Sequence, residues 1–200
     1  MQSEFSGPYP TRESITRERI MDACVRGIAQ HGLHNLKVKH IIDSSGISRQ
    51  TLYNHYRNRN DIIRDAFVRE GVRVSEACAN EITRYASVED KFVKGMVFMH
   101  GALPRNPIMS QIVLHHREFL DVIGLGTVPL DQFGRLCFAA VIEAHPALEP
   151  EFAEISELWS RSVLSFLLFE GEKKRSEQEL EDYIRRRLAP GLGLARLGIP

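Results

Sequence analysis

The most informative segment of this chain reads Gly46-Ile47-Ser48-Arg49-Gln50-Thr51-Leu52-Tyr53-Asn54-His55-Tyr56. Gly46 can adopt a positive φ at the end of one helix, and Ser48 is a good N-cap for the next one. Ile47 just before the cap and Leu52 four residues beyond it suit a hydrophobic staple, which fixes the angle at which the chain enters the helix. The segment therefore predicts a tight turn that opens a short helix.

That short helix carries many side chains that can form hydrogen bonds. Four of them have no evident structural duty: Arg49, Gln50, Thr51 and Asn54. In the major groove of DNA, Arg pairs with guanine, Gln or Asn pairs with adenine, and the methyl group of Thr contacts thymine. We expect these four side chains to read base edges.

Helical patterns flank the turn on both sides. Upstream, apolar residues recur at helical spacing from Ile20 to Ile28, and Gly32 stands where a helix end is expected. Val38, Ile41 and Ile42 then indicate a two-turn helix before Gly46. Downstream, Asn58 can cap a further helix, with an acidic residue in its first turn. These patterns predict a complete helix-turn-helix.

The segment from about Thr16 to Val68 resembles the DNA-binding domain of the tetracycline-repressor (TetR) family of bacterial transcriptional regulators. The matching elements are Arg19-Ile20-Met21-Asp22-Ala23, Gln30-His31-Gly32, Val38-Lys39-His40-Ile41-Ile42, Gly46-Ile47-Ser48, Thr51-Leu52-Tyr53-Asn54-His55-Tyr56 and Arg59-Asn60-Asp61-Ile62-Ile63. The departures from the usual pattern are Lys37 for Thr or Ser, Ile42 for Ala, Tyr56 for Phe and Arg59 for Lys. The resemblance implies a repressor that a small molecule releases from a palindromic operator.

Phosphate contacts position such a protein on DNA without reading sequence. Lys37, Lys39 and Arg59 are cationic candidates for these contacts, and the N-terminus of the short helix at Ser48 presents amides to a phosphate. The resemblance implies that Tyr53 and His55 also meet phosphates and that Tyr56 packs inside the domain.

The charge is unevenly distributed along the chain, although the net charge is zero. Residues 11–59 hold nine basic and four acidic residues. A basic head on an acidic body is typical of a DNA-binding domain joined to a domain with another task. We expect a disordered arm at residues 1–10, a helix-turn-helix domain at 11–58, and a helical domain for effector binding and dimerisation at 59–200.

Beyond the fourth helix the pattern stays helical, which predicts an all-α protein of about nine helices, the number that the family also has. Two late helices, near residues 151–169 and 176–188, occupy the positions at which the family dimerises. The first is apolar over a wide arc and must bury two faces. The interface residues that we expect are Trp159, Val163, Phe166, Leu167, Tyr183 and Ile184.

The resemblance also implies an effector cavity inside the C-terminal helices. Methionine and aromatic side chains adapt well to such cavities, and histidines among them can orient a ligand. The expected lining is Met96, Met99, His100, Met109, His116, Phe119, Phe133, Phe138 and Trp159. The effector is expected to be small and partly apolar. An ordinary core role remains the alternative for each of these side chains.

Several function classes lack support in the sequence. The sequence contains no catalytic motif and no phosphate-binding loop. His115 and His116 are adjacent, so on a helix their side chains point about 100° apart and cannot bind one metal ion together. We expect no enzyme activity, cofactor, metal or membrane span, and reduced, buried cysteines in a cytoplasmic protein. The open alternatives are an activator or an architectural DNA-binding protein without an effector, with a helix-turn-helix recombinase as a more distant one.

Overall fold

The computed structural model describes residues 11–115, 130–169 and 175–198. Within these ranges the chain is all-α, as predicted, with nine α-helices and four short 3-10 helices. The α-helices are α1 (Arg12–Asn35), α2 (Val38–Ser45), α3 (Arg49–His55), α4 (Arg59–Ile82), α5 (Val88–Ala102), α6 (Ser110–Leu114), α8 (Leu130–Ala144), α9 (Phe152–Leu168) and α10 (Glu177–Arg187). The 3-10 helices span Leu103–Arg105, Pro146–Leu148, Ala189–Leu192 and Leu194–Leu197. The expected arm at 1–10 lies outside the described residues.

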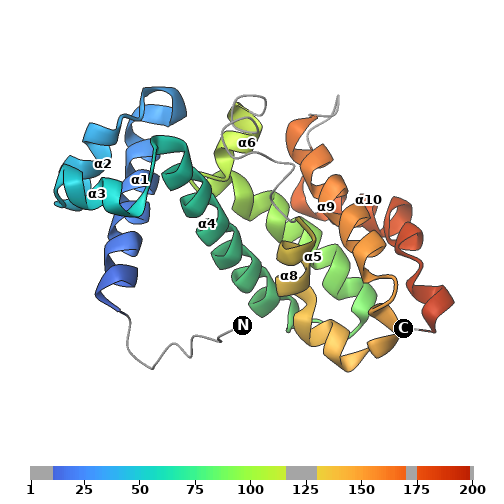
Figure 1. The fold of residues 1–200 in the computed structure, drawn as a ribbon. Helices are drawn as coiled ribbons and strands as arrows, with labels where there is room; N and C mark the ends of the chain where they lie inside the picture. The colour runs from blue at the N-terminus through green and yellow to red at the C-terminus, as the bar shows by residue number, and fades with distance from the viewer. Residues whose placement is uncertain (1–10, 116–129, 170–174, 199–200) are drawn as a thin grey trace.

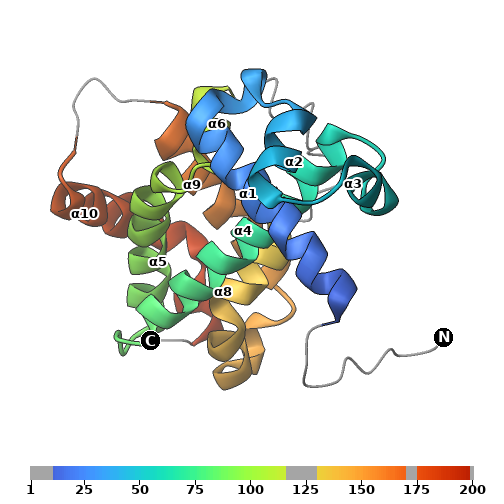
Figure 2. The same ribbon diagram turned by 90° about the vertical axis from the view of Figure 1, so that its left-hand side faces the viewer.

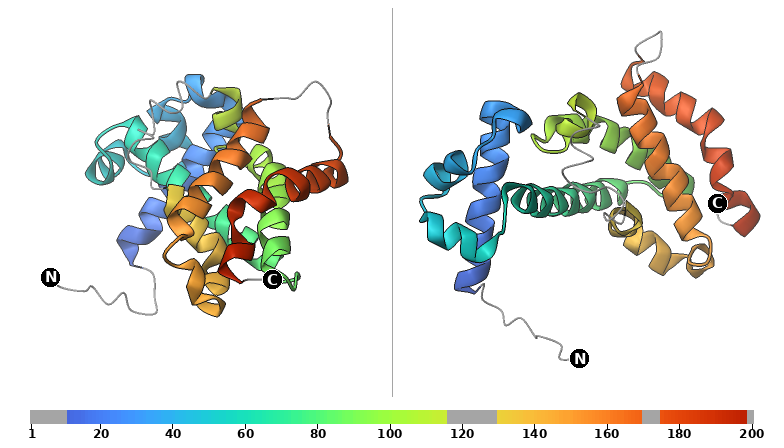
Figure 3. Two further views of the ribbon diagram at one scale, coloured as in Figure 1. Left: turned by 90° about the vertical axis from the view of Figure 1, so that its right-hand side faces the viewer. Right: turned by 45° about the horizontal axis from the view of Figure 1, so that its top comes forward.

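Two groups of helices are joined by one long helix (Figure 1). Helices α1, α2 and α3 form a head at one end, and Figure 2 views the molecule from that side. Helix α4 begins against α1 and runs into the body, where it packs on α5 and α8. Helices α9 and α10 lie on the far side of the body from the head (Figure 3).

Local sequence signals set most helix ends. The side chains of Ser48, Asn58, Ser87 and Ser176 each accept a hydrogen bond from a backbone amide at the start of a helix, as N-caps do. Gly32, with φ of 74°, interrupts α1 where the sequence predicted its end. The sequence pattern predicts that the fourth helix runs to about residue 85, whereas α4 ends at Ile82. It also predicts a sixth helix that reaches residues 119–120 and a break at 124–129. Helix α6 ends at Leu114, and the remainder of that prediction lies outside the described residues.

Gly46 ends α2 in the left-handed region, with φ of 66°, and its amide donates to the carbonyl of Ile42 at 3.0 Å. A side chain at this φ costs about 1–2 kcal/mol. We expect Gly46→Ala to lower the free energy of unfolding by that amount in urea titrations. The control is Gly101→Ala inside α5, where alanine should instead stabilise the helix by about 0.5–1 kcal/mol. Equal effects of the two substitutions would contradict the assigned turn.

The core of the body is aromatic. The rings of Phe92 and Phe138 stack with their centroids 4.1 Å apart, and the ring of Trp159 meets Phe138 edge-on at 5.2 Å. The indole Nε1 of Trp159 donates to the carbonyl of Phe92 at 3.0 Å, which satisfies its polar atom inside the core. These contacts hold α5, α8 and α9 together. Among the described residues, no helix is long and apolar enough to cross a membrane.

Candidate DNA-binding surface and effector cavity

The short helix α3 is fixed to the head by its buried residue and its cap. Leu52 is fully buried, and the Oγ atom of Ser48 accepts from the amide of Thr51 at 3.0 Å. Ile47, just before the cap, packs against the same core, as expected of a hydrophobic staple. The helix therefore presents its outer face in one orientation.

Three of the four predicted base-reading residues are exposed on that face: Arg49, Gln50 and Asn54. Thr51 is half-buried, and its hydroxyl lies 2.8 Å from the Ser48 hydroxyl. The Thr51 oxygen thus belongs to the helix cap, which leaves its methyl group as the part suited to a thymine contact.

The predicted phosphate-binding residues around α3 also lie near the outer surface of the head. Lys37 and Lys39 are exposed, Tyr53 is 44% exposed, and His55 is half-buried. Lys37 precedes α2, and its backbone amide donates to Nδ1 of His40 at 3.2 Å. An ammonium group has no acceptor, so the Lys37 side chain does not cap α2 as Thr or Ser would. Ser48 remains the N-cap of α3.

Arg59 points inward, unlike the other predicted phosphate contacts. Its Nη2 atom donates to the carbonyl of Leu33, and its Nε atom is buried without a hydrogen-bond partner. Burial lowers the pKa of this guanidinium from its usual value. In this structure Arg59 links the start of α4 to the end of α1. Its expected phosphate contact stays a prediction, and substitution of Arg59 tests it against this structural role.

We expect Arg59→Ala to lower the free energy of unfolding by about 1–2 kcal/mol, because the Leu33 carbonyl loses its donor. The salt dependence of DNA binding should remain unchanged. The control for stability is Arg57→Ala at an exposed neighbouring position, which should leave the free energy of unfolding unchanged. A smaller salt slope for Arg59→Ala with unchanged stability would instead place this side chain on a phosphate.

Three other arginines of the head form contacts within the protein that the sequence pattern did not predict. Arg19 donates to the carbonyl of Ser45 at 2.7 Å, and Arg26 donates to the hydroxyl and carbonyl of Ser44. Both guanidinium groups therefore satisfy the C-terminal end of α2. Arg17 pairs with Asp65 at 2.5 Å and joins α1 to α4.

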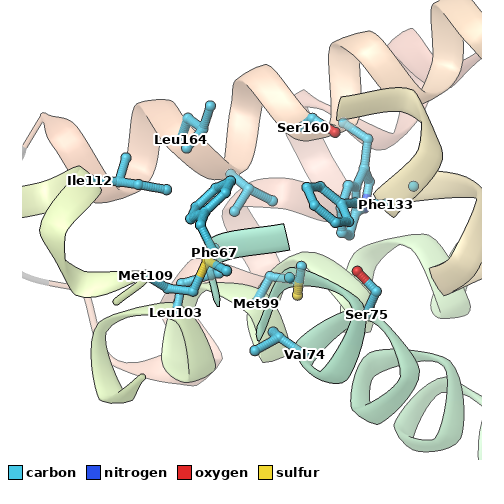
Figure 4. A pocket seen from close by; sticks show the side chains of 14 residues that line it. Phe67, Val74, Ser75, Met99, Leu103, Met109, Ile112, Phe133, Ser160 and Leu164 are labelled. Atoms are coloured by element: carbon cyan, nitrogen blue, oxygen red, sulfur yellow. The ribbon is translucent and has the colours of Figure 1, made fainter. Parts of the chain in front are cut away.

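A half-open cavity of about 70 Å³ lies in the body between α4, α5, α6, α8 and α9 (Figure 4). The described residues in its wall are Phe67, Gly71, Val74, Ser75, Met99, Leu103, Met109, Ile112, Phe133, Gly134, Trp159, Ser160, Val163 and Leu164. The rings of Phe67 and Phe133 meet edge-on inside it, with centroids 6.3 Å apart.

Part of the predicted lining occurs in this wall: Met99, Met109, Phe133 and Trp159. Met96 and Phe138 are each 1% exposed and absent from the wall, as core residues would be. His100 is half-buried and also absent from it. His116 and Phe119 lie outside the described residues. Sequence reasoning placed α4 in the effector-binding domain, but its apolar pattern does not show which of its positions face a cavity. It therefore missed the wall residues of α4, which are Phe67, Gly71, Val74 and Ser75, and also Leu103, Ile112, Gly134, Ser160, Val163 and Leu164.

A hydrogen-bonded network centred on Glu70 connects the cavity wall to the head. Glu70 is 7% exposed, and its Oε1 atom accepts from Arg69 at 2.9 Å and from Arg73 at 2.8 Å. Arg69 also pairs with Glu18 and Asp22 of α1, each at 2.8 Å. The network thereby ties α4 to the head.

The same carboxylate reaches the cavity wall through Asn106. The amide of Asn106 donates to Oε2 of Glu70 at 2.9 Å, and its carbonyl oxygen accepts from the backbone amides of Ile108 and Met109. Met109 is itself a wall residue. A second contact joins the head to the end of α6, where Nε2 of His34 lies 3.4 Å from Nδ1 of His115.

The predicted dimer interface is only partly accessible on the subunit. Trp159, Val163 and Ile184 are 2%, 3% and 0% exposed; because they are buried inside the subunit, they cannot contact a second copy directly. Leu167 is 9% exposed. Phe166 and Tyr183 are half-buried and meet edge-on between α9 and α10.

Two exposed apolar residues extend this face of α9. Leu158 is 38% exposed and Phe169, just after the helix, is 74% exposed. They are eleven residues apart, about three helical turns, so they lie on the same side. Of the predicted interface residues, Phe166 and Tyr183 are partly exposed and stay predicted for dimerisation. Leu158 and Phe169 are exposed apolar residues that the sequence analysis did not assign to the interface.

The head and the exposed face of α3 are those of a helix-turn-helix protein. Residues 20–66 match the family model described as "Bacterial regulatory proteins, tetR family". The probable acrEF/envCD operon repressor of Escherichia coli K12 is 22% identical over 111 residues, which cover 53% of this chain and 50% of that repressor. The chain thus spans about half the length of the curated relatives it matches.

Solved structures share the fold over most of the chain. A TetR-family transcriptional regulator from Mesorhizobium loti MAFF303099 aligns with a TM-score of 0.62 and 15% identity, covering 94% of this chain and 98% of that one. AibR, solved with isovaleryl coenzyme A and operator DNA, aligns with a TM-score of 0.50 and 16% identity, covering 88% and 98%. Residues 20–66 thus match the tetR family of bacterial regulatory proteins, and the fold of the chain is similar to that of solved TetR-family regulators.

Proposed function

We propose that this chain is a cytoplasmic, ligand-responsive transcriptional repressor that binds a palindromic operator as a homodimer. The observation that carries this proposal is the pairing of an exposed reading helix, α3, with a cavity that the Glu70 network connects to the head. The similarity to an operon repressor of E. coli and to a regulator solved with operator DNA supports it.

In this proposal residues 11–58 bind DNA, and residues 59–200 bind the effector and form the dimer. Arg49, Gln50, Thr51 and Asn54 read base edges in the major groove, while Lys37, Lys39, Ser48, Tyr53 and His55 contact phosphates. A second copy supplies the second half-site, because one reading helix spans only one major groove.

Release from DNA requires that the effector bind the off-DNA form more tightly than the on-DNA form. The proposed route begins at Met109 and Ile112 in the cavity wall. A shift of this wall changes the hydrogen bond between Asn106 and Glu70, and through Arg69 it changes the position of α1 relative to α4. The spacing of the two reading helices in the dimer changes with it.

The test is selection of bound fragments from the source genome by the purified protein, followed by salt titration of the selected sites. A short palindromic sequence, bound by two copies, is the expected result. Tight binding without a preferred sequence would support the architectural alternative and contradict the repressor. If bound sites raise transcription from a linked reporter, the protein is an activator. No binding at low salt would contradict the DNA-binding role.

A further inference from the structure

The chemistry of the cavity wall restricts the molecule that can occupy it. We propose that the cavity takes an uncharged, mainly apolar molecule with one hydrogen-bonding atom placed at Ser75. That this molecule is the effector rests on the proposed function, whereas its chemical class follows from the residues of the cavity wall.

Among the described residues, no wall residue carries a charge. A carboxylate or phosphate inside would lose its hydration without gaining a counter-ion, which is strongly unfavourable. Glu70 neighbours the wall residue Gly71 in sequence, but both of its oxygens are engaged by Arg69, Arg73 and Asn106. The described part of the wall thus offers no counter-ion to a charged ligand.

One polar group in the wall lacks a proper partner. Ser75 is fully buried, and its Oγ atom makes no hydrogen bond of normal geometry among the described residues. The Cys137 thiol is a polar neighbour, but sulfur is a weak acceptor. An unsatisfied buried hydroxyl is unfavourable, so a ligand oxygen or nitrogen near Ser75 would remove that cost. Figure 4 shows this hydroxyl on the α4 side of the cavity and Ser160 on the α9 side.

The size of the cavity indicates that its wall must move to admit this molecule. Benzene occupies an apolar cavity of about 150 Å³ in a well-studied protein, whereas this cavity measures about 70 Å³. Met99 and Met109 have side chains that readily change rotamer. The Phe133 ring covers Gly71, where an added Cβ would lie 2.6 Å from the ring. Phe133 therefore packs directly on the backbone of Gly71, and in our proposal its ring moves together with Met99 and Met109 when the ligand enters.

The test uses three probes of equal ring size: benzyl alcohol, toluene and benzoate. Each is titrated into the full chain, with binding followed by calorimetry and by thermal unfolding. We expect both neutral probes to bind. A tenfold excess over the dissociation constant should raise the Tm by about 3 °C. Benzoate should bind at least about a hundredfold more weakly than benzyl alcohol, because its charge would be unpaired. Comparable binding of benzoate, or no binding of either neutral probe, would overturn the proposal.

Two substitutions test whether the probes bind in the cavity. Ser75→Ala should weaken benzyl alcohol about tenfold and leave toluene unchanged, whereas the control Ser165→Ala, at an exposed serine of α9, should affect neither probe. Leu164→Trp, which fills the cavity from a partly exposed position, should abolish binding of both. Equal losses of both probes in Ser75→Ala would remove Ser75 as the polar anchor. These binding measurements do not involve DNA, so they test the ligand site separately from the proposed function. If the neutral probes bind but the protein selects no operator, the ligand site is supported and the proposed regulatory function is contradicted.

Discussion

Alanine at Asn54 is expected to reduce the affinity for the selected operator while leaving the affinity for random DNA unchanged. A bidentate contact between an amide and adenine discriminates by about 1–3 kcal/mol per half-site, so the operator affinity should fall by about tenfold to a hundredfold for each half-site lost. Asn54 is exposed on α3, and its replacement should leave the thermal stability unchanged. The measurement is a competition titration of operator against random DNA at one salt concentration.

The matched control is Asn80→Ala, at an exposed position of α4 outside the head. It should change neither affinity. An equal loss on operator and on random DNA would assign Asn54 to a phosphate, and an unchanged operator affinity would remove it from the interface altogether.

Arg69→Ala is expected to produce the largest loss of stability. The Arg69 side chain is 11% exposed and contacts Glu18, Asp22 and the buried Glu70. Removing one partner of a buried charge costs about 3–5 kcal/mol; because Arg73 and Asn106 still serve Glu70, we expect the lower end of that range. The measurement is the free energy of unfolding from urea titration.

Arg73→Ala is the control for this prediction, since Arg73 binds the same carboxylate oxygen with a side chain that is 52% exposed. A half-exposed ion pair contributes about 0–1 kcal/mol. The loss in Arg69→Ala should also resist added salt, because buried charges are screened weakly. Equal losses in the two variants would show that the carboxylate, rather than the link to α1, governs the stability of this network.

The head was predictable because its signals are local. A glycine with positive φ, a capping serine and an alternation of buried and exposed positions lie within a few residues of one another, and each constrains the backbone directly. The all-α architecture followed for the same reason. The capping role of Ser48 and the burial of Leu52 needed no information from distant parts of the chain.

The cavity and the direction of long side chains were less predictable, since both depend on how distant helices cross. Arg59 resembles a phosphate contact in the sequence, yet its guanidinium meets a carbonyl 26 residues away. Met96 and Met99 lie one turn apart on α5, but the cavity touches Met99 alone. The sequence identifies side chains that are able to line a cavity. Which of them line it depends on how α4, α5, α6, α8 and α9 pack against one another.

The hydrogen bonds and ion pairs that the head's arginines form within the protein have a kinetic consequence. Of the nine basic residues between Thr11 and Arg59, Arg17, Arg19, Arg26 and Arg59 are bonded within the protein. Of the other five, Arg49 is proposed to read a base edge, so four remain to meet phosphates. Each phosphate contact contributes about 0.9 to the slope of log K against log salt. A subunit with few free cations is held weakly by arbitrary sequence. Such a protein leaves wrong sites quickly, and base contacts make up a larger share of its affinity for the right site.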